Sequence, residues 1–118
     1  MQRWHPPSAR RPCGKWSVLE ELYAAGVQPE DITLVFARGV HRAHTDAERR
    51  HLAGEQAFSE ITCIDSDPED CLCLGTTRRG TPVEIMRTVA EADRRICLGN
   101  IEFHYFAGYS GGAKAIMP

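Results

Sequence analysis

The chain has 118 residues, enough for one domain and too few for several. Its formal charge of −2 at pH 7 gives no electrostatic reason to expect nucleic acid or an anionic membrane as a partner. With 42% hydrophobic residues, no apolar run of membrane-spanning length and no hydrophobic signal region at its start, the sequence is typical of a soluble globular domain.

Cysteine usage favours a reducing compartment. Four of the five cysteines lie in apolar, strand-like runs, where cysteine usually behaves as a small hydrophobic residue: Cys63, Cys71, Cys73 and Cys97. There is no Cys-x-x-Cys pair, so the spacing does not predict a zinc site. We expect a cytoplasmic protein with no metal ligand that can be named from these residues.

The start of the chain divides into an irregular segment and the beginning of a domain. Residues 1–15 carry three prolines and four basic residues with little periodicity, so we expect the α/β domain to occupy residues 16–118. A capping box that opens at Ser17 and a glycine stop at Gly26 predict a short helix over residues 18–25.

A strand and a second helix follow, with a histidine between them. The β-branched and apolar run 32–37 predicts a strand covered on both faces. A second capping box, opening at Thr45, and Gly54 mark the ends of the next helix. His41 therefore lies after a strand and before a helix, where ligands bind in open parallel sheets. A loop histidine that only makes surface hydrogen bonds is the alternative.

The middle of the chain predicts more strands. Residues 61–64 indicate a strand, and the acidic run 65–70 indicates a solvated turn, with metal binding unsupported by any neighbouring ligand. Residues 71–76 and 81–86 are typical of a β-hairpin, and residues 87–93 of a brief helix. The alternation predicts an α/β fold with a mainly parallel, Rossmann-like sheet, short helices and an inserted β-hairpin. Helices this short should leave apolar surface exposed.

The last twenty residues are the most informative part of the sequence. The apolar run 96–98 predicts a buried strand, and the loop after it is rich in glycine and aromatic residues. Glycines let a backbone approach a ligand closely, so His104, Ser110 and Lys114 are expected to converge on one bound molecule. The spacing fits neither a Walker P-loop nor a Rossmann fingerprint. A glycine turn over packed aromatic rings is the alternative.

Three segments carry a resemblance to a known family. Residues 26–37 with 39–42, residues 74–83, and residues 91–118 resemble motifs of the N-terminal domain of the nickel-dependent lactate racemase (LarA-like) family. The third segment resembles the family's longest motif, which is highly specific and nearly intact from His104 to Lys114.

The resemblance implies a racemase or epimerase of 2-hydroxy acids that uses a nickel pincer nucleotide, a pyridinium mononucleotide derivative. It implies that Lys114 binds this cofactor covalently and that Ser110, Gly111 and Gly112 form its loop. It further implies that His41 and His104 act as acid and base, and that Arg11 binds the substrate carboxylate.

The chain also departs from the family pattern. Val40 stands where the family has threonine, Arg38 replaces a small residue, and Ser8 stands in place of an acidic residue. These changes bear on substrate identity more than on the type of reaction. The family's proteins are several times longer, and its nickel-binding histidine lies beyond residue 118.

We therefore expect a domain fragment without turnover of its own. The alternative is a non-catalytic remnant that binds a nucleotide, an anion or a partner chain, with self-association through an exposed sheet edge.

Overall fold

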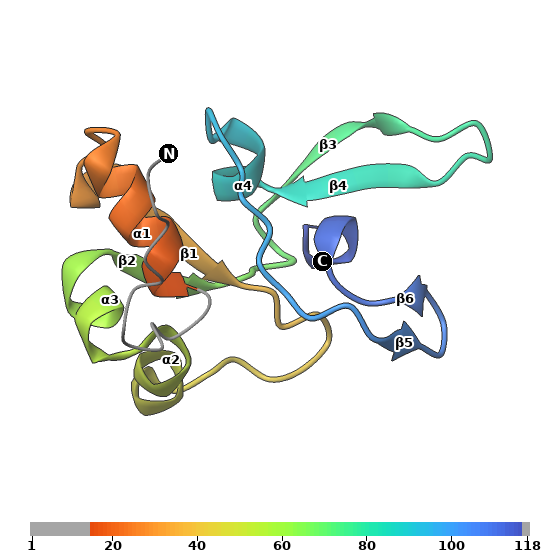
Figure 1. Ribbon diagram of the computed structural model, residues 1–118. Coiled ribbons are helices and arrows are strands. Elements are labelled where there is room, and N and C mark those ends of the chain that lie inside the picture. The colour runs from red at the N-terminus through yellow and green to blue at the C-terminus, as the bar shows by residue number, and fades with distance from the viewer. Residues whose placement is uncertain (1–14, 117–118) are drawn as a thin grey trace, which may run out of the picture.

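The computed structural model describes residues 15–116, and its first element is helix α1, Lys15–Ala24 (Figure 1). The expectations for the segment before it, including the role of Arg11, lie outside the described residues. The helix begins earlier than predicted, so Ser17 lies within its first turn and the predicted N-terminal cap is wrong. A helix can extend past a capping pattern towards the N-terminus when neither glycine nor proline interrupts it, as here.

The predicted end of α1 is confirmed. The Gly26 N–H donates to the Tyr23 carbonyl at 2.9 Å, and the Val27 N–H donates to the Leu22 carbonyl at 3.0 Å. These are the two hydrogen bonds of a Schellman motif. Gly26 has a φ of 89°, a conformation that favours glycine at this position.

The centre of the molecule is a pair of parallel strands. After the short 3₁₀ helix η1, Pro29–Asp31, come strand β1, Thr33–Phe36, and later strand β2, Thr62–Asp65. Thr33 pairs with Thr62 at one end and Phe36 with Asp65 at the other. Both predicted strands are confirmed, each with its ends shifted by one residue.

Two helices connect these strands, where the sequence predicted one. Helix α2, Asp46–Ala53, begins with the predicted capping box, in which Thr45 and Glu48 hydrogen-bond reciprocally. Gly54 ends α2, but it also precedes helix α3, Glu55–Glu60. The glycine therefore turns the chain between two helices, and α3 was not predicted from the sequence.

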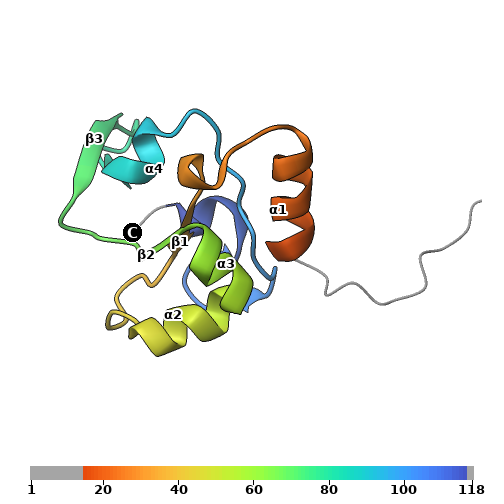
Figure 2. The same cartoon turned by 90° about the vertical axis from the view of Figure 1, so that its left-hand side faces the viewer.

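The core lies between one face of the β1–β2 pair and helices α1 to α3 (Figure 2). Its buried residues are Leu19, Ala53, Ala57 and Ile61. Half-buried residues packed against them are Tyr23, Ile32, Leu34, Phe36, Phe58 and Cys63. Because alternate strand residues share a face, Ile32, Leu34 and Phe36 all point to this core. On the other face Thr33 is exposed and Val35 half-buried, so the expected cover on both faces is incomplete.

A β-hairpin projects from this body. Strands β3, Cys71–Thr76, and β4, Pro82–Met86, pair antiparallel, as predicted, with an irregularity between Cys73 and Gly75. Helix α4, Arg87–Glu91, follows β4 directly and packs near its base. Figure 1 shows the hairpin extending away from α1, α2 and α3.

The C-terminal region differs most from expectation. Residues 96–98 form no strand, and Ile96 and Leu98 are exposed. The region instead contains a small antiparallel pair, β5, Phe103–His104, and β6, Gly108–Tyr109, followed by the 3₁₀ helix η2, Gly112–Ala115. An apolar run becomes a strand only when a neighbouring edge accepts its backbone hydrogen bonds, which local sequence cannot guarantee.

The fold is mixed α/β, but parallel pairing is limited to one of three two-stranded sheets in the described residues. The expected mainly parallel sheet is therefore wrong for this part of the chain, and the Rossmann-like arrangement stays a prediction. The expected exposure of apolar surface is confirmed, since Val40, Phe103, Tyr105 and Phe106 are all at least 84% exposed. No helix among the described residues combines the length and apolar character needed to cross a bilayer.

Candidate functional site

His41 lies in an exposed turn at the carboxyl end of β1, as the sequence predicted. We call residues 38–44, which connect β1 to the start of α2, the His41 loop. The His41 N–H donates to the Arg38 carbonyl at 3.1 Å, which closes the turn. The imidazole is exposed, and within the described residues it has no hydrogen-bond partner. It is therefore free to meet a ligand.

Arg38 ties the first half of this loop to the end of β2. Its backbone N–H donates to the Ser66 hydroxyl at 3.1 Å, and its Nε donates to the Ser66 carbonyl at 2.9 Å. A guanidinium nitrogen of Arg38 also donates to the His41 carbonyl at 2.6 Å. Ser66 is itself buried, with 8% exposure. Arg38, one of the departures from the family pattern, thus fixes the turn that carries His41.

His44 ties the second half of the loop to Asp65. The His44 backbone N–H donates to Asp65 Oδ2 at 2.6 Å, and His44 Nδ1 lies 2.8 Å from Oδ1. The Asp65 side chain is only 8% exposed, so the expectation that this acidic run is a solvated turn is wrong at its first residue. Asp65 is the last residue of β2 and contacts the His41 loop, whereas Asp67, Glu69 and Asp70 are exposed.

Opposing effects act on the Asp65 carboxyl. Burial raises its pKa, but hydrogen bonds from the His44 ring and backbone, with the charges of His44 and Arg49, lower the pKa below its ordinary value. Arg49 NH1 lies 4.0 Å from Asp65 Oδ2. Asp65 is thus held ionised, as the acceptor of both N–H groups of His44.

The second half of the candidate site is the C-terminal loop, residues 99–116. The Ser110 hydroxyl accepts the Glu102 N–H at 2.9 Å and donates to the Asn100 carbonyl at 2.9 Å. Gly111 lies against the same stretch of chain, because a Cβ there would meet the Asn100 carbonyl oxygen at 3.1 Å. Both residues therefore close the loop on itself.

His104 is held in one orientation by its own turn. The backbone N–H groups of Phe106 and Ala107 point at His104 Nδ1, at 3.3 Å and 3.0 Å. Because Nδ1 accepts these bonds, the proton of the neutral ring is on Nε2. The half-buried imidazole therefore presents an N–H donor to its surroundings.

Lys114 lies on η2, with an exposed side chain that has no partner in the described part of the chain. A Cβ added to Gly112, two residues before it, would meet no heavy atom within 4 Å, so the backbone there is open to approach. Within residues 15–116, no hydrogen bond, ion pair or ring contact joins His41, His104 and Lys114, and their convergence stays a prediction.

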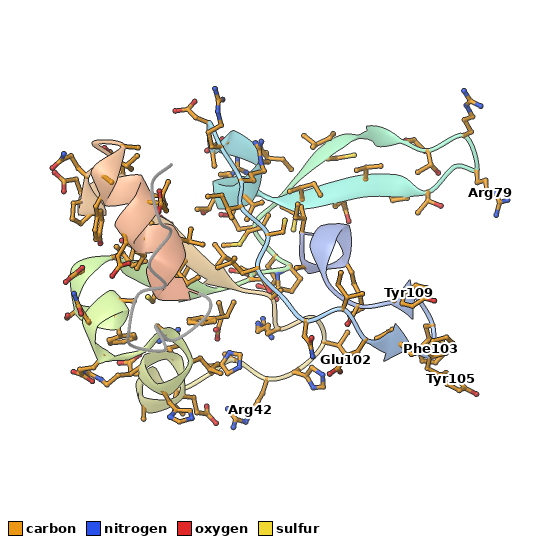
Figure 3. All side chains as sticks on the ribbon, in the orientation of Figure 1. Arg42, Arg79, Glu102, Phe103, Tyr105 and Tyr109 are labelled. Carbon is orange, nitrogen blue, oxygen red and sulfur yellow. The ribbon has the colours of Figure 1, made fainter. Side chains whose placement is uncertain are left out.

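Exposed aromatic residues flank His104 in the sequence. The rings of Phe103 and Tyr109 meet edge to face at 5.9 Å, and those of Tyr105 and Phe106 do so at 5.2 Å. Figure 3 shows Phe103, Tyr105 and Tyr109 gathered at the tip of the β5–β6 pair, apart from Arg42. The rings contact one another but remain exposed to solvent. The alternative of a packed aromatic cluster is therefore supported only in part.

The expected site residues that the structure describes include two imidazoles and one amine. Among the described residues, no three His, Cys, Asp or Glu side chains gather as a metal site would require. One imidazole is unengaged, one is a fixed N–H donor, and the Lys114 amine is exposed. An open hollow on α2 and α3 contains none of the expected residues; it is lined by Asp46, Ala47, Arg50, His51, Gly54 and Glu55.

The roles of His44, Asp65 and Ser66 were not predicted from the sequence. A signal was present, because β1 and β2 were both predicted and the carboxyl ends of parallel strands meet at one edge. Residues directly after one strand should then contact residues after the other. Asp65 pairs with Phe36 across the sheet, which places its carboxylate beside the His41 loop.

Comparison with known proteins adds a family relationship. Residues 15–118 match the family model described as the lactate racemase N-terminal domain. The chain is 34% identical over 91 residues to a lactate racemase of Thermoanaerobacterium thermosaccharolyticum, covering 75% of this chain and 21% of the relative. It is 33% identical over 90 residues to a lactate racemase of Lactiplantibacillus plantarum, covering 74% and 21%. The aligned part of the chain spans about a fifth of these relatives.

Proposed function

Because this chain belongs to the lactate racemase N-terminal domain family, we propose that it supplies the acid–base residues of a racemase or epimerase of 2-hydroxy acids. The observation that carries the proposal is the family match, which extends over residues 15–118 and includes both histidines and the lysine. The relatives are about five times as long as the part that aligns with this chain, so we expect turnover only with the remaining domain present.

The two histidines differ in a way that suits the two faces of a substrate. We propose that His41, whose ring is unengaged, takes the proton of the substrate hydroxyl. Imidazole suits this step because its ordinary pKa of about 6.5 lets it accept and return a proton near neutrality. His104 donates a hydrogen bond from Nε2 to the substrate oxygen. The opposite enantiomer forms when its oxygen takes a proton from His104 as an imidazolium. Nδ1 is then protonated too and must release the amides of Phe106 and Ala107. In the reverse reaction the two histidines exchange roles.

The C-terminal loop fits part of the expected cofactor site. Lys114 has an exposed amine suited to covalent attachment, and Gly112 leaves space for close approach of a phosphate or ring. Ser110 is less suited to a direct contact, since its hydroxyl already donates to Asn100 and accepts from Glu102. When bound, a nickel pincer nucleotide would supply the acceptor for the hydrogen that leaves the substrate α-carbon with its electron pair.

A chimaera tests this proposal. Residues 15–118 replace the matching segment of the T. thermosaccharolyticum relative, in a host that makes the cofactor, and chiral chromatography follows lactate and 2-hydroxybutyrate. We expect racemisation that is lost in His41→Asn and His104→Asn but kept in His51→Asn, whose histidine is exposed on α2. Intact-mass measurement should show a cofactor adduct that Lys114→Ala removes.

Three results would count against it. A loaded, folded chimaera that racemises neither acid would overturn the activity. Racemisation at the parent rate in both histidine variants would overturn their roles. An adduct that persists in Lys114→Ala would overturn the lysine assignment.

A further inference from the structure

The His41 loop is attached at both ends to the same short segment at the end of β2. Arg38 binds Ser66, and His44 binds Asp65. We propose that Asp65 and His44 form a clamp that holds the His41 loop on the carboxyl end of β2 and thereby positions His41. His44 and Asp65 are positioning residues, and the consequence for catalysis rests on the proposed role of His41.

Both carboxylate oxygens of Asp65 bind the same residue, His44. Oδ2 accepts the His44 backbone N–H at 2.6 Å, and Oδ1 meets His44 Nδ1 at 2.8 Å. A carboxylate held by two donors from the same residue fixes both the backbone and the ring of that residue. The clamp is largely removed from water, with side-chain exposures of 8% for Asp65 and 27% for His44.

Neighbouring groups further restrict the ring. The Phe36 ring lies 5.9 Å from the His44 ring, tilted by 59°. Arg49, from α2, lies 4.0 Å from Asp65 Oδ2 and partly compensates its charge. Strand, loop and helix α2 therefore meet at one carboxylate.

The spacing limits how far His41 can move. His41 lies three residues from Arg38 and three from His44, and three residues of extended chain reach about 10 Å. Arg38 also holds the His41 carbonyl directly, at 2.6 Å. With both anchors in place the loop has few arrangements, whereas loss of the His44 anchor frees its second half.

The clamp also fixes the tautomer of His44. An ionised carboxylate only accepts, so Nδ1 must carry the proton and the neutral ring has an unprotonated Nε2. Asparagine can place an N–H near the position of Nδ1 but has no atom at Nε2. His44→Asn therefore keeps the clamp while it removes any chemistry at Nε2, and His44→Ala removes both.

The test uses the 118-residue chain, labelled with ¹⁵N, and needs no activity. Ring ¹H–¹⁵N spectra should show His44 as the Nδ1–H tautomer. Hydrogen exchange at the backbone amides of His41 and His44 should be slow in the wild type and in His44→Asn, and about tenfold faster in His44→Ala and Asp65→Ala. His51→Asn is the matched control and should leave the exchange rates of both amides unchanged. Exchange at the Ile61 amide reports whether the core is intact.

The outcomes separate the clamp from the proposed function. An Nε2–H tautomer of His44 in the wild type would overturn the clamp without any variant being made. Unchanged exchange at His41 in a folded Asp65→Ala would overturn it as well. In the active chimaera, His44→Ala should lower kcat at unchanged KM, and His44→Asn should restore it. A freed loop with unchanged kcat would refute the catalytic consequence while the clamp itself stands.

Discussion

At the scale of single residues, the charge at the end of β2 has the widest consequences. Asp65 would be expected to point into water from its sequence context, yet its carboxylate is buried and accepts two hydrogen bonds from His44. A buried carboxylate costs free energy unless it is fully paired, which is why His44 and Arg49 surround it.

This pairing predicts a pH-dependent stability. The pKa of Asp65 is lowered in the folded protein, so its contribution is present above the ordinary aspartate pKa of about 3.9 and is lost as the pH falls below it. Asp65→Asn should lower the free energy of unfolding by about 2 kcal/mol at pH 6. Urea unfolding at pH 6 and at pH 3 should show the difference shrinking on acidification. A difference that grows towards pH 3 would contradict the assignment.

Two adjacent glycines give a second prediction at this scale. Gly111 and Gly112 have φ values of 81° and 53°, so alanine is strained at both. Only at Gly111 would a Cβ also press on the Asn100 carbonyl oxygen, at 3.1 Å. Gly111→Ala should therefore speed amide exchange at Ser110 more than Gly112→Ala does. Equal effects would mean that the Asn100 contact is not retained in solution.

At the scale of elements, local signals were reliable at two helix ends. The capping box before α2 and the Schellman motif after α1 both formed where the sequence predicted an end. Each depends on hydrogen bonds between residues only a few positions apart. Such contacts form whenever the helix forms, whatever surrounds it.

The capping box can be tested directly. The Thr45 hydroxyl accepts the Glu48 N–H at 3.3 Å, and the Glu48 carboxylate accepts the Thr45 N–H at 2.8 Å. Thr45→Ala should cost about 1 kcal/mol in the free energy of unfolding, and Thr45→Ser should cost little. Thermal unfolding followed by circular dichroism measures both. A serine variant as unstable as the alanine variant would show that the methyl group, not the hydroxyl, matters.

The run 96–98 shows where local signals stop. Its composition is that of a buried strand, yet Ile96 is 56% exposed and Leu98 44% exposed. Helix hydrogen bonds close within one segment, but a strand needs an edge supplied by another segment. Within the described residues, 96–98 pair with no strand, and the chain continues as an irregular connection to β5.

At the scale of the whole molecule, the core is small. Four buried residues, from α1, α2, α3 and the position before β2, hold the body together: Leu19, Ala53, Ala57 and Ile61. Two of them are alanines, so the closest approach of α2 and α3 to the sheet depends on small side chains. With a core this small, the loss of any one large residue should lower the free energy of unfolding substantially.

Leu19 provides the test. It is 5% exposed, and Leu19→Ala should lower the free energy of unfolding by about 3 kcal/mol through lost burial and a cavity. Leu74, 63% exposed on the projecting hairpin, is the matched control. Leu74→Ala should change the free energy of unfolding by less than about 0.5 kcal/mol. Urea unfolding monitored at one protein concentration compares the two. Similar losses for both variants would contradict the assigned core.

The exposed apolar surface has one more consequence at this scale. Seven of the large exposed hydrophobic residues lie between residues 96 and 109: Ile96, Leu98, Ile101, Phe103, Tyr105, Phe106 and Tyr109. Surface of this kind usually marks an interface. The aligned part of the chain spans about a fifth of its relatives. Self-association through an exposed strand edge stays a prediction.

The candidate site shows the same division as the fold. The sequence motifs identified the family, and they placed His41 in a loop after a strand, which the structure confirms. The anchors of that loop, Ser66 and His44 with Asp65, came only from the structure. The two contacts join residues 28 and 21 positions apart, so the sequence could indicate them only through the expected pairing of β1 with β2 and not through a local pattern.

The sequence alone determined the helix ends at Gly26 and Thr45, the hairpin β3–β4 and the membership of a racemase family, because each depends on neighbouring residues or on a linear motif. It also indicated where β1 and β2 lie, through two apolar runs, but their pairing joins distant residues. Only the tertiary structure decided that residues 96–98 stay unpaired, that the Asp65 side chain is shielded from water, and that His104 presents its Nε2 proton. These depend on which backbone groups and charges meet in space, and water, a strand edge or a distant side chain can satisfy the same group equally well.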